Sequence, residues 1–300
     1  MSKGNNHILI TKLRSYSSVF SRRVFSDIIK YGDFSHLNWL YSKYDNQSPR
    51  SFDTYLEYIK YIYTSISKSY RCEYVFKNEI INQLLLKKYG TKNTIAFNEF
   101  RVGNSIVDFA IMNGESKAFE IKTEFDSPRR LRKQMDDYMR IFNKSYIVVT
   151  SENRAFYENI IEPETGIIEL VVKNRRLALN IYREAQALTS IDAGIVMKCL
   201  RTSEYENIVK SYFESLPKAQ PHQMYEACAK CMAKIPFESL NELFLREIKK
   251  RKSTTNRLDT IPKEIRQIYL SMNLSDKDQI RLMSNLNKPL NINSICISHI

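Results

Sequence analysis

The chain has 300 residues, a net charge of +13 and 43% hydrophobic residues, so it is globular and basic rather than disordered. Its length suffices for one large domain or two modest ones. The seven glycines form no phosphate-binding or dinucleotide-binding loop, and the four histidines stand far apart, which disfavours an ATP-driven motor, a zinc hydrolase and a histidine-based nuclease.

Nothing in the sequence suggests export or a membrane anchor. The first residues lack the apolar run of a signal peptide, and no stretch approaches ~20 apolar residues. Five scattered cysteines, at positions 72, 199, 228, 231 and 296, fit free thiols in a reducing compartment. We therefore expect a cytoplasmic protein without a membrane span.

Residues 7–70 show helical spacing, with Tyr58, Ile62 and Ile66 on one stripe. The many tyrosines here either stack on bases or pack a helix face against the domain, and we favour packing. Residues 73–89 predict a further helix that ends at Gly90. Glu79 lies beside the apolar face of this helix, as either a solvated glutamate or a site residue.

A strand is expected over residues 94–102, followed by a turn at Gly103-Asn104. Glu99 interrupts this strand and is a weak candidate for the same site. Two apolar runs then flank Asn113-Gly114, a dipeptide typical of hairpins. Asp108 breaks the first run, and Glu120-Ile121-Lys122 ends the second. Carboxylates in mid-strand are costly to bury unless they are paired or bind metal.

The register of this hairpin decides whether the two carboxylates meet. A two-residue Asn113-Gly114 loop would pair Asp108 with Phe119 and place the carboxylates on opposite faces. A metal site needs Asp108 opposite Glu120, which requires a three-residue loop that includes Glu115, or a bulge. We predict the second register.

Ser127 and Pro128 have the residue types of a helix N-cap and first helical position, and residues 128–143 show an apolar helical stripe. Gln134 lies at the border of that stripe, and Tyr138 follows one turn later. Four cations crowd the first turns, where the helix dipole disfavours them. They either bind phosphate or form a solvated face; they are Arg129, Arg130, Arg132 and Lys133.

Residues 145–150 form a continuous apolar run, typical of a buried central strand. A helix over 151–161 and strands over 166–172 and 177–182 would complete an α/β core of αβββαβ type with a mixed sheet. From residue 188 onward the pattern predicts helices over residues 189–200, 203–215, 218–234, 237–251 and 275–285. We therefore divide the chain into a helical N-terminal region (1–72), a core (73–185) and a helical C-terminal domain (186–300).

Asp108 followed by Glu120-Ile121-Lys122 resembles the signature of the PD-(D/E)XK nuclease superfamily, which has the restriction-endonuclease-like fold. Val107 occupies the variable proline position. Gln134 and Tyr138 resemble the Q-x-x-x-Y motif of the branch that contains lambda-type exonucleases and nuclease domains of bacterial recombination enzymes. The resemblance covers residues 74–172 and is closest to a little-characterised bacterial and phage group.

The resemblance implies a Mg²⁺-dependent (or Mn²⁺-dependent) deoxyribonuclease, acting in phage defence or in phage DNA metabolism. Asp108, Glu120 and the Ile121 carbonyl would hold the metal, and Lys122 would orient or deprotonate the attacking water. Glu79, the upstream glutamate that many members carry, would ligate through water or bind a second metal. Gln134 and Tyr138 would position the substrate phosphate. An iron–sulfur cluster, which some relatives hold, is disfavoured because the tight downstream cysteine triplet is missing.

The charge distribution fits nucleic-acid binding. Residues 1–72 carry a net +6, residues 73–162 carry +1, and residues 163–300 carry +6. Basic segments thus flank an acidic centre, as suits a metal site that acts on a polyanion, although a generally basic composition also explains the excess. The alternative function is a non-catalytic module that binds nucleic acid or protein, with the C-terminal domain as a possible protein contact. The intact motif favours the enzyme.

Overall fold

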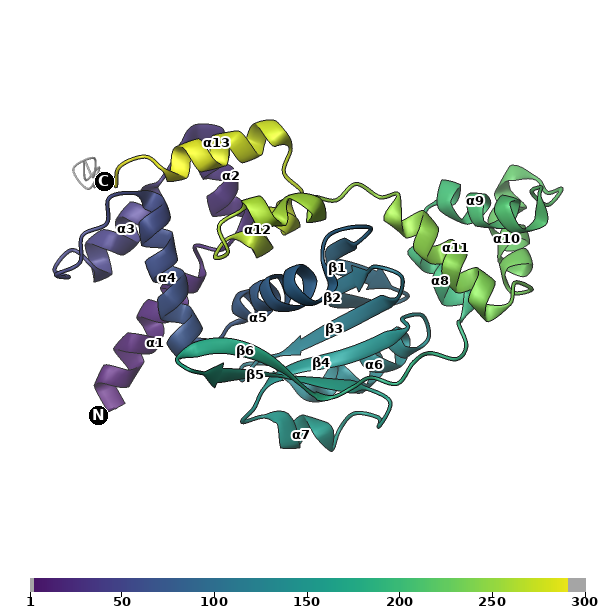
Figure 1. Ribbon diagram of the computed structural model, residues 1–300, viewed down its shortest axis with the longest axis horizontal. Helices are drawn as coiled ribbons and strands as arrows, with labels where there is room; N and C mark the ends of the chain where they lie inside the picture. Colours follow the sequence, from purple (N-terminus) through teal and green to yellow (C-terminus); the bar gives the residue numbers. More distant parts are fainter. Residues whose placement is uncertain (1–2, 291–300) are drawn as a thin grey trace. The chain divides into compact units, whose positions relative to one another are not determined.

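The computed structural model describes residues 3–290, and the chain divides into two compact units (Figure 1). One unit combines the residues up to 78 with those from 257 onward, and the other contains residues 79–256. These boundaries differ from those expected from sequence, because the chain after residue 186 contributes to both units.

The first unit is helical, as predicted for residues 7–70. Its helices are α1 (Lys3–Ser17), α2 (Arg22–Tyr31), α3 (Ser35–Tyr44), α4 (Tyr55–Ser69), α12 (Arg266–Met272) and α13 (Asp276–Leu286). Several tyrosines are buried here: Tyr16 and Tyr58 are fully buried and donate hydrogen bonds to the Asp45 carboxylate. This supports the packing interpretation of the tyrosine stripe for these residues.

Long-range hydrogen bonds tie the end of the chain to the N-terminal helices. The Tyr74 hydroxyl donates to the Glu264 carbonyl at 2.8 Å, and the Asn285 amide donates to the Ile28 carbonyl at 2.7 Å. The sequence pattern does not predict helix α12. It is short, its residues Ile268 and Tyr269 are buried, and the backbone N–H of Gln267 donates to Asn78 Oδ1, 189 residues earlier in the chain, at 3.0 Å.

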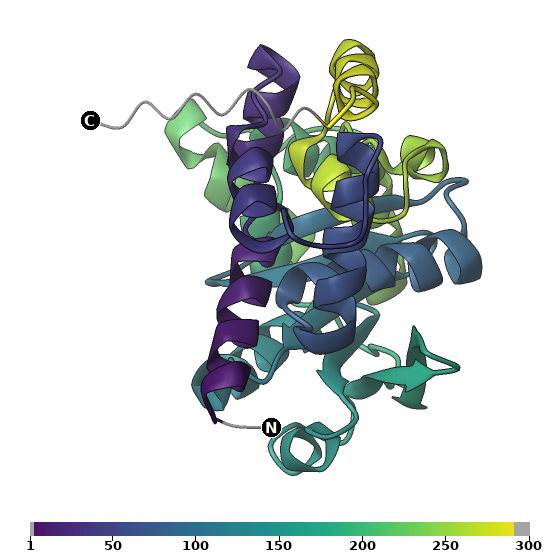
Figure 2. The ribbon, with the colours of Figure 1, turned by 90° about the vertical axis from the view of Figure 1, so that its left-hand side faces the viewer.

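The second unit is built on one mixed sheet of six strands, in the order of the sequence. The strands are β1 (Ile95–Val102), β2 (Ser105–Met112), β3 (Ser116–Lys122), β4 (Lys144–Thr150), β5 (Gly166–Lys173) and β6 (Arg176–Arg183). Neighbours β3–β4 and β4–β5 are parallel, and the other pairs are antiparallel. The expected buried central strand is confirmed as β4. The edge strand β6 is only partly covered, and the β5–β6 hairpin is also visible in Figure 2.

Helices accompany the sheet in the second unit. Helix α5 (Glu73–Glu79) ends the N-terminal segment of the first unit, and the chain continues into the second unit as a π-helix (Ile80–Tyr89). A 3-10 turn (Pro128–Arg130) and α6 (Leu131–Met139) follow β3, and α7 (Arg154–Glu158) follows β4. The C-terminal part of the unit contains α8 (Ala193–Cys199), α9 (Thr202–Phe213), α10 (Met224–Met232) and α11 (Phe237–Lys249). The helices expected over 128–143 and 151–161 are thus present but shorter.

The two faces of the sheet bury different side chains, since register partners share a face. Phe119 and Tyr146 lie on one face and stack with ring centroids 5.6 Å apart. Ala118 and Ile147 lie on the other face, in a core that includes Leu131 of α6. The π-helix and α6 both lie against the sheet in Figure 1.

Candidate functional site

The β2–β3 hairpin has the register that the metal-site hypothesis required. Met112 pairs with Ser116 across a three-residue loop, and the ladder continues to Phe109 opposite Phe119. Asp108 is one residue before this last pair and Glu120 one residue after it. The two carboxylates therefore lie on the same face of the hairpin, and the prediction of a three-residue loop is confirmed.

The pairing of β2 with both of its neighbouring strands is interrupted at Asp108, without a change of register on β1. On β1, Asn98 pairs with Phe109 and Phe100 pairs with Val107, and between them Glu99 has a left-handed φ of 63°. On β3, the backbone N–H of Ile121 donates to Asp108 Oδ2 at 2.8 Å. A side chain thus takes a donor of β3, which opens the hairpin at the site.

Glu120 lies at the centre of the cluster and is only 1% exposed. Its Oε1 accepts a hydrogen bond from Lys122 Nζ at 2.7 Å, and its Oε2 accepts one from the Tyr138 hydroxyl at 2.8 Å. Burial raises the pKa of the Glu120 carboxyl, and the Lys122 ammonium, Tyr138 and Gln134 oppose that rise only in part. The ionised carboxylate is therefore costly here unless further positive charge lies close by.

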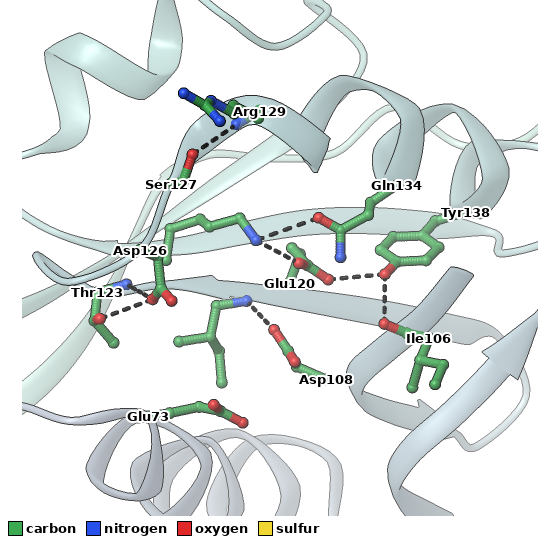
Figure 3. A network of polar contacts seen from close by, with 12 residues as sticks. Glu73, Ile106, Asp108, Glu120, Thr123, Asp126, Ser127, Arg129, Gln134 and Tyr138 are labelled. Carbon is green, nitrogen blue, oxygen red and sulfur yellow. Dashed lines mark hydrogen bonds and ion pairs between the residues drawn. The ribbon is translucent and has the colours of Figure 1, made fainter. Parts of the chain in front are cut away.

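Helix α6 supplies two side chains from successive turns, and both point toward Glu120 in Figure 3. Gln134 Oε1 accepts from Lys122 Nζ at 3.3 Å. Tyr138 is fully buried, and its hydroxyl also lies 2.7 Å from the Ile106 carbonyl. Burial, followed by the Glu120 charge, raises the pKa of Tyr138 well above its usual value. In this structure Tyr138 supports the carboxylate and has no exposed surface with which to contact a substrate.

The start of α6 is fixed by local hydrogen bonds that the sequence signalled. Ser127 accepts from the backbone N–H of Arg129 at 3.4 Å, which confirms its capping position with Pro128 next (Figure 3). Asp126 accepts from the Thr123 N–H and hydroxyl at 2.8 and 2.7 Å, which closes the turn between β3 and the helix. These bonds set the angle at which α6 approaches Glu120.

The other predicted site residues lie outside this network. Glu79 accepts a hydrogen bond from Gln83 at 2.5 Å, and Gln83 in turn bonds the backbone of β6. Glu79 therefore belongs to the contacts that join the π-helix to β6. The four cations are exposed, as both of their interpretations require: they are Arg129, Arg130, Arg132 and Lys133. One of them, Arg132, donates to the Ile160 carbonyl at 3.3 Å.

Other candidate centres contribute nothing to this site. Within residues 3–290 no three or more His, Cys, Asp or Glu side chains are grouped so that they could hold a metal ion. The described cysteines, 72, 199, 228 and 231, are free thiols, while Cys296 and His299 lie outside the described residues. None of the helices in the described part has the length and apolar character needed to cross a bilayer.

Sequence reasoning found the acidic pair, Lys122, Gln134 and Tyr138, but missed how they are connected. It did not foresee that the Ile106 carbonyl shares the Tyr138 hydroxyl with Glu120, because a backbone acceptor leaves no signal in the sequence. Sequence reasoning also did not single out Lys117, a buried lysine of β3. Alternation along the strand puts its side chain on the face of Phe119, two residues later.

These observations define a mixed α/β protein with a buried carboxylate–lysine cluster between a hairpin and a helix. Residues 67–271 match the family model described as Bacteriophage P4 protein cII, which is more than half of the chain, and the chain belongs to that family. Protein cII of Enterobacteria phage P4 is 25% identical over 175 residues, which cover 57% of this chain and 65% of that protein, under two thirds of its length. A solved protein of unknown function from Silicibacter pomeroyi aligns with 46% of this chain and 88% of its own at 13% identity, with a TM-score of 0.30.

Proposed function

We propose that this protein is a metal-dependent nuclease that hydrolyses phosphodiester bonds in DNA, and that its sheet and flanking helices form a restriction-endonuclease-like core. The observation that carries the proposal is the convergence of Asp108, Glu120 and Lys122 on one face where β2 and β3 separate. The chain order of helix, β1, β2, β3, α6 and β4 agrees with the expected αβββαβ arrangement.

The donor set fits a hard divalent cation such as Mg²⁺ or Mn²⁺. Asp108 and Glu120 would hold the metal, with the Ile121 carbonyl as a third ligand. Glu120 would be stabilised by a cation placed beside it, because burial raises the pKa of its carboxyl despite the neighbouring ammonium. Each carboxylate oxygen has two acceptor positions, so the bonds from Lys122 and Tyr138 leave capacity for a cation. When bound, the metal would polarise the phosphate and activate a water molecule.

The side chains around the carboxylates then have separate tasks. Lys122 is held in place by Glu120 and Gln134, and its ammonium would orient the attacking water or stabilise charge on the phosphate. Gln134, which is only half-buried, is the residue of α6 that can also contact the substrate. Tyr138 positions Glu120 from within the core.

Exposed cations beside the site would bind the DNA backbone. Arg129, Arg130 and Lys133 lie at the start of α6, directly after the turn that leaves β3. Contacts of this kind depend on phosphate charge and carry no sequence information. We place this activity in phage or prophage DNA metabolism or in phage defence, in the cytoplasm, and membership of a phage protein family supports the phage context.

A non-catalytic binding module is the second candidate. The observation that favours it is that both Glu120 oxygens already accept hydrogen bonds from this chain, so the cluster is satisfied as a structural element. Such a module would bind nucleic acid or protein and would cleave nothing.

The deciding experiment is incubation of the protein with labelled linear, circular and single-stranded DNA, with Mg²⁺, Mn²⁺ or EDTA. The nuclease predicts cleavage that requires the metal and is lost with EDTA. If the protein binds DNA but does not cleave it under any of these conditions, its function is that of the non-catalytic binding module.

A further inference from the structure

A polar pocket lies at the other end of β3, away from the carboxylate cluster. It has a volume of about 360 Å³, within the range of small-molecule sites. It is lined by Lys88, Tyr89, Asn113, Gly114, Glu115, Lys117, Lys144, Tyr146 and Glu184. Lys117 pairs with Lys144 in the β3–β4 ladder, so both lie on the face of Phe119, opposite to Glu120.

Positive charge lies deep in this pocket. The Lys117 side chain is only 6% exposed, and burial lowers the pKa of its ammonium although Glu115 acts against that change. The same ammonium lies 4.8 Å from the centre of the Tyr89 ring and donates a hydrogen bond to Asn113 Oδ1 at 3.1 Å. A charge this far from water is costly unless an anion faces it.

Negative charge lies at the rim instead. The Glu115 side chain is 50% exposed and reaches Lys117 at 3.2 Å and Lys144 at 3.8 Å. Glu184 is 60% exposed, 3.9 Å from Lys88, and accepts from the Tyr146 hydroxyl at 2.7 Å. Exposed carboxylates can turn into water at little cost, so an entering anion could replace Glu115 on the two lysines.

The helix that supplies Lys88 and Tyr89 has an unusual geometry. Both residues belong to the last turn of the π-helix Ile80–Tyr89. Such segments are rare and often accompany functional sites. Burial, with the charges of Glu184 and Glu115, raises the pKa of Tyr89 to about 12, so its hydroxyl stays protonated and can donate to an anion.

We propose that this pocket binds a small phosphorylated molecule, whose phosphate takes the place of the Glu115 carboxylate on Lys117 and Lys144. Three lysines against two movable carboxylates leave a net positive site once Glu115 turns outward. The volume exceeds that of a phosphate ion, which leaves room for the rest of a small ligand. This inference does not depend on the proposed nuclease activity.

The test is a thermal-shift and calorimetric titration with pyrophosphate, AMP and adenosine, all in EDTA so that no divalent metal contributes. Pyrophosphate and AMP should raise the melting temperature in a saturable way, since a ligand that binds the folded state stabilises it. Adenosine, which lacks the phosphate, should not. Stabilisation by pyrophosphate alone would identify a simple polyphosphate ligand, and stabilisation by AMP as well would indicate a nucleotide.

Two variants give opposite expected effects. Lys144→Ala should weaken pyrophosphate binding roughly tenfold or more, because a charge-assisted hydrogen bond is removed. Glu115→Gln should tighten binding by roughly threefold to tenfold, because the competing charge is gone. Lys173→Ala, which removes an exposed cation at the far end of β5, is the control and should change nothing. No saturable binding, or an equal response in Lys144→Ala and Lys173→Ala, would overturn the proposal.

Discussion

The Tyr138 hydroxyl lies 2.8 Å from Glu120 Oε2 and 2.7 Å from the carbonyl of Ile106. One hydroxyl carries a single proton, so it can donate to only one of these oxygens at a time. From its place on α6, Tyr138 thus contacts both Glu120 of β3 and Ile106 of β2. These contacts lie beside the point where the Asp108 side chain accepts the hydrogen bond of the Ile121 N–H. Tyr138 thus holds the open end of the hairpin and sets the position of Glu120.

Replacing this hydroxyl should cost stability. Tyr138→Phe removes the hydroxyl that faces the buried Glu120 carboxylate and the partly buried Ile106 carbonyl, and we expect a loss of about 1–3 kcal/mol. Tyr157→Phe is the matched control, since Tyr157 is buried in the same unit but takes no part in this network, and its change should stay near zero. Chemical denaturation measures both variants, and equal losses would show that the Tyr138 hydroxyl contributes nothing.

Lys122 and Glu120 should depend strongly on each other. Lys122→Met leaves a buried carboxylate without its cation, and we expect a loss of about 3–5 kcal/mol. Adding Glu120→Gln to this variant removes the remaining charge and should restore part of the stability. The exposed pair Lys88–Glu184, with its atoms 3.9 Å apart, provides the control cycle and should show a coupling below about 1 kcal/mol. Similar coupling energies in the two cycles would mean that burial does not strengthen the interaction between Lys122 and Glu120.

Substitutions of Glu120 and of Lys122 should affect catalysis in different ways. Glu120→Gln should weaken metal binding and abolish metal-dependent cleavage. Lys122→Ala should lower the cleavage rate by about 10²–10³-fold while metal and DNA still bind, because its ammonium acts chiefly in the transition state. Metal calorimetry and single-turnover cleavage assays, run where each variant is folded, measure these effects. Wild-type rates in both variants would exclude the proposed site.

DNA affinity should fall with salt through the exposed cations at the start of α6. Replacing Arg129, Arg130, Arg132 and Lys133 with glutamine should reduce the slope of log affinity against log salt by about 0.9 for each DNA phosphate that these side chains neutralise. The control neutralises as many exposed cations elsewhere in the same unit: Lys92, Lys173, Arg175 and Arg176. If the control changes the slope as much, the α6 cluster is only a solvated face.

Acid should weaken the helical part of the second unit through Glu204. Burial raises the pKa of this carboxyl, but two hydrogen bonds from Arg251, at 2.7 and 2.6 Å, and one from the Arg201 N–H lower it overall. A lowered pKa contributes stability above the unfolded value of about 4.3, and this contribution is lost as the pH falls through the folded value. Glu204→Gln should therefore lower stability at pH 7 and flatten its decline below about pH 4.3 in melting curves. An acid decline as steep as in the wild type would contradict this role.

Local patterns in the sequence determined the elements that build the candidate site. Strand alternation placed Asp108 and Glu120, and the Ser127-Pro128 signal placed the start of the helix that carries Gln134, because side-chain periodicity and capping depend only on near neighbours. The length of the hairpin loop was not fixed by the Asn-Gly signal. The observed register puts Phe109 opposite Phe119 in the buried core, and a shift by one residue would have turned the side chains of one strand to the opposite face and separated Asp108 from Glu120.

Tertiary structure alone decided the rest. The residues after 186 divide between two units because burial rewards packing against distant segments, and helical spacing does not say which segment a helix will meet. The motif that contains Tyr138 implied that this residue contacts the substrate, and only the tertiary structure shows that its side chain is buried in the core. Lys88, Lys117 and Lys144 are far apart in the chain, and only the pairing of β3 with β4 and the end of the π-helix bring them to one pocket.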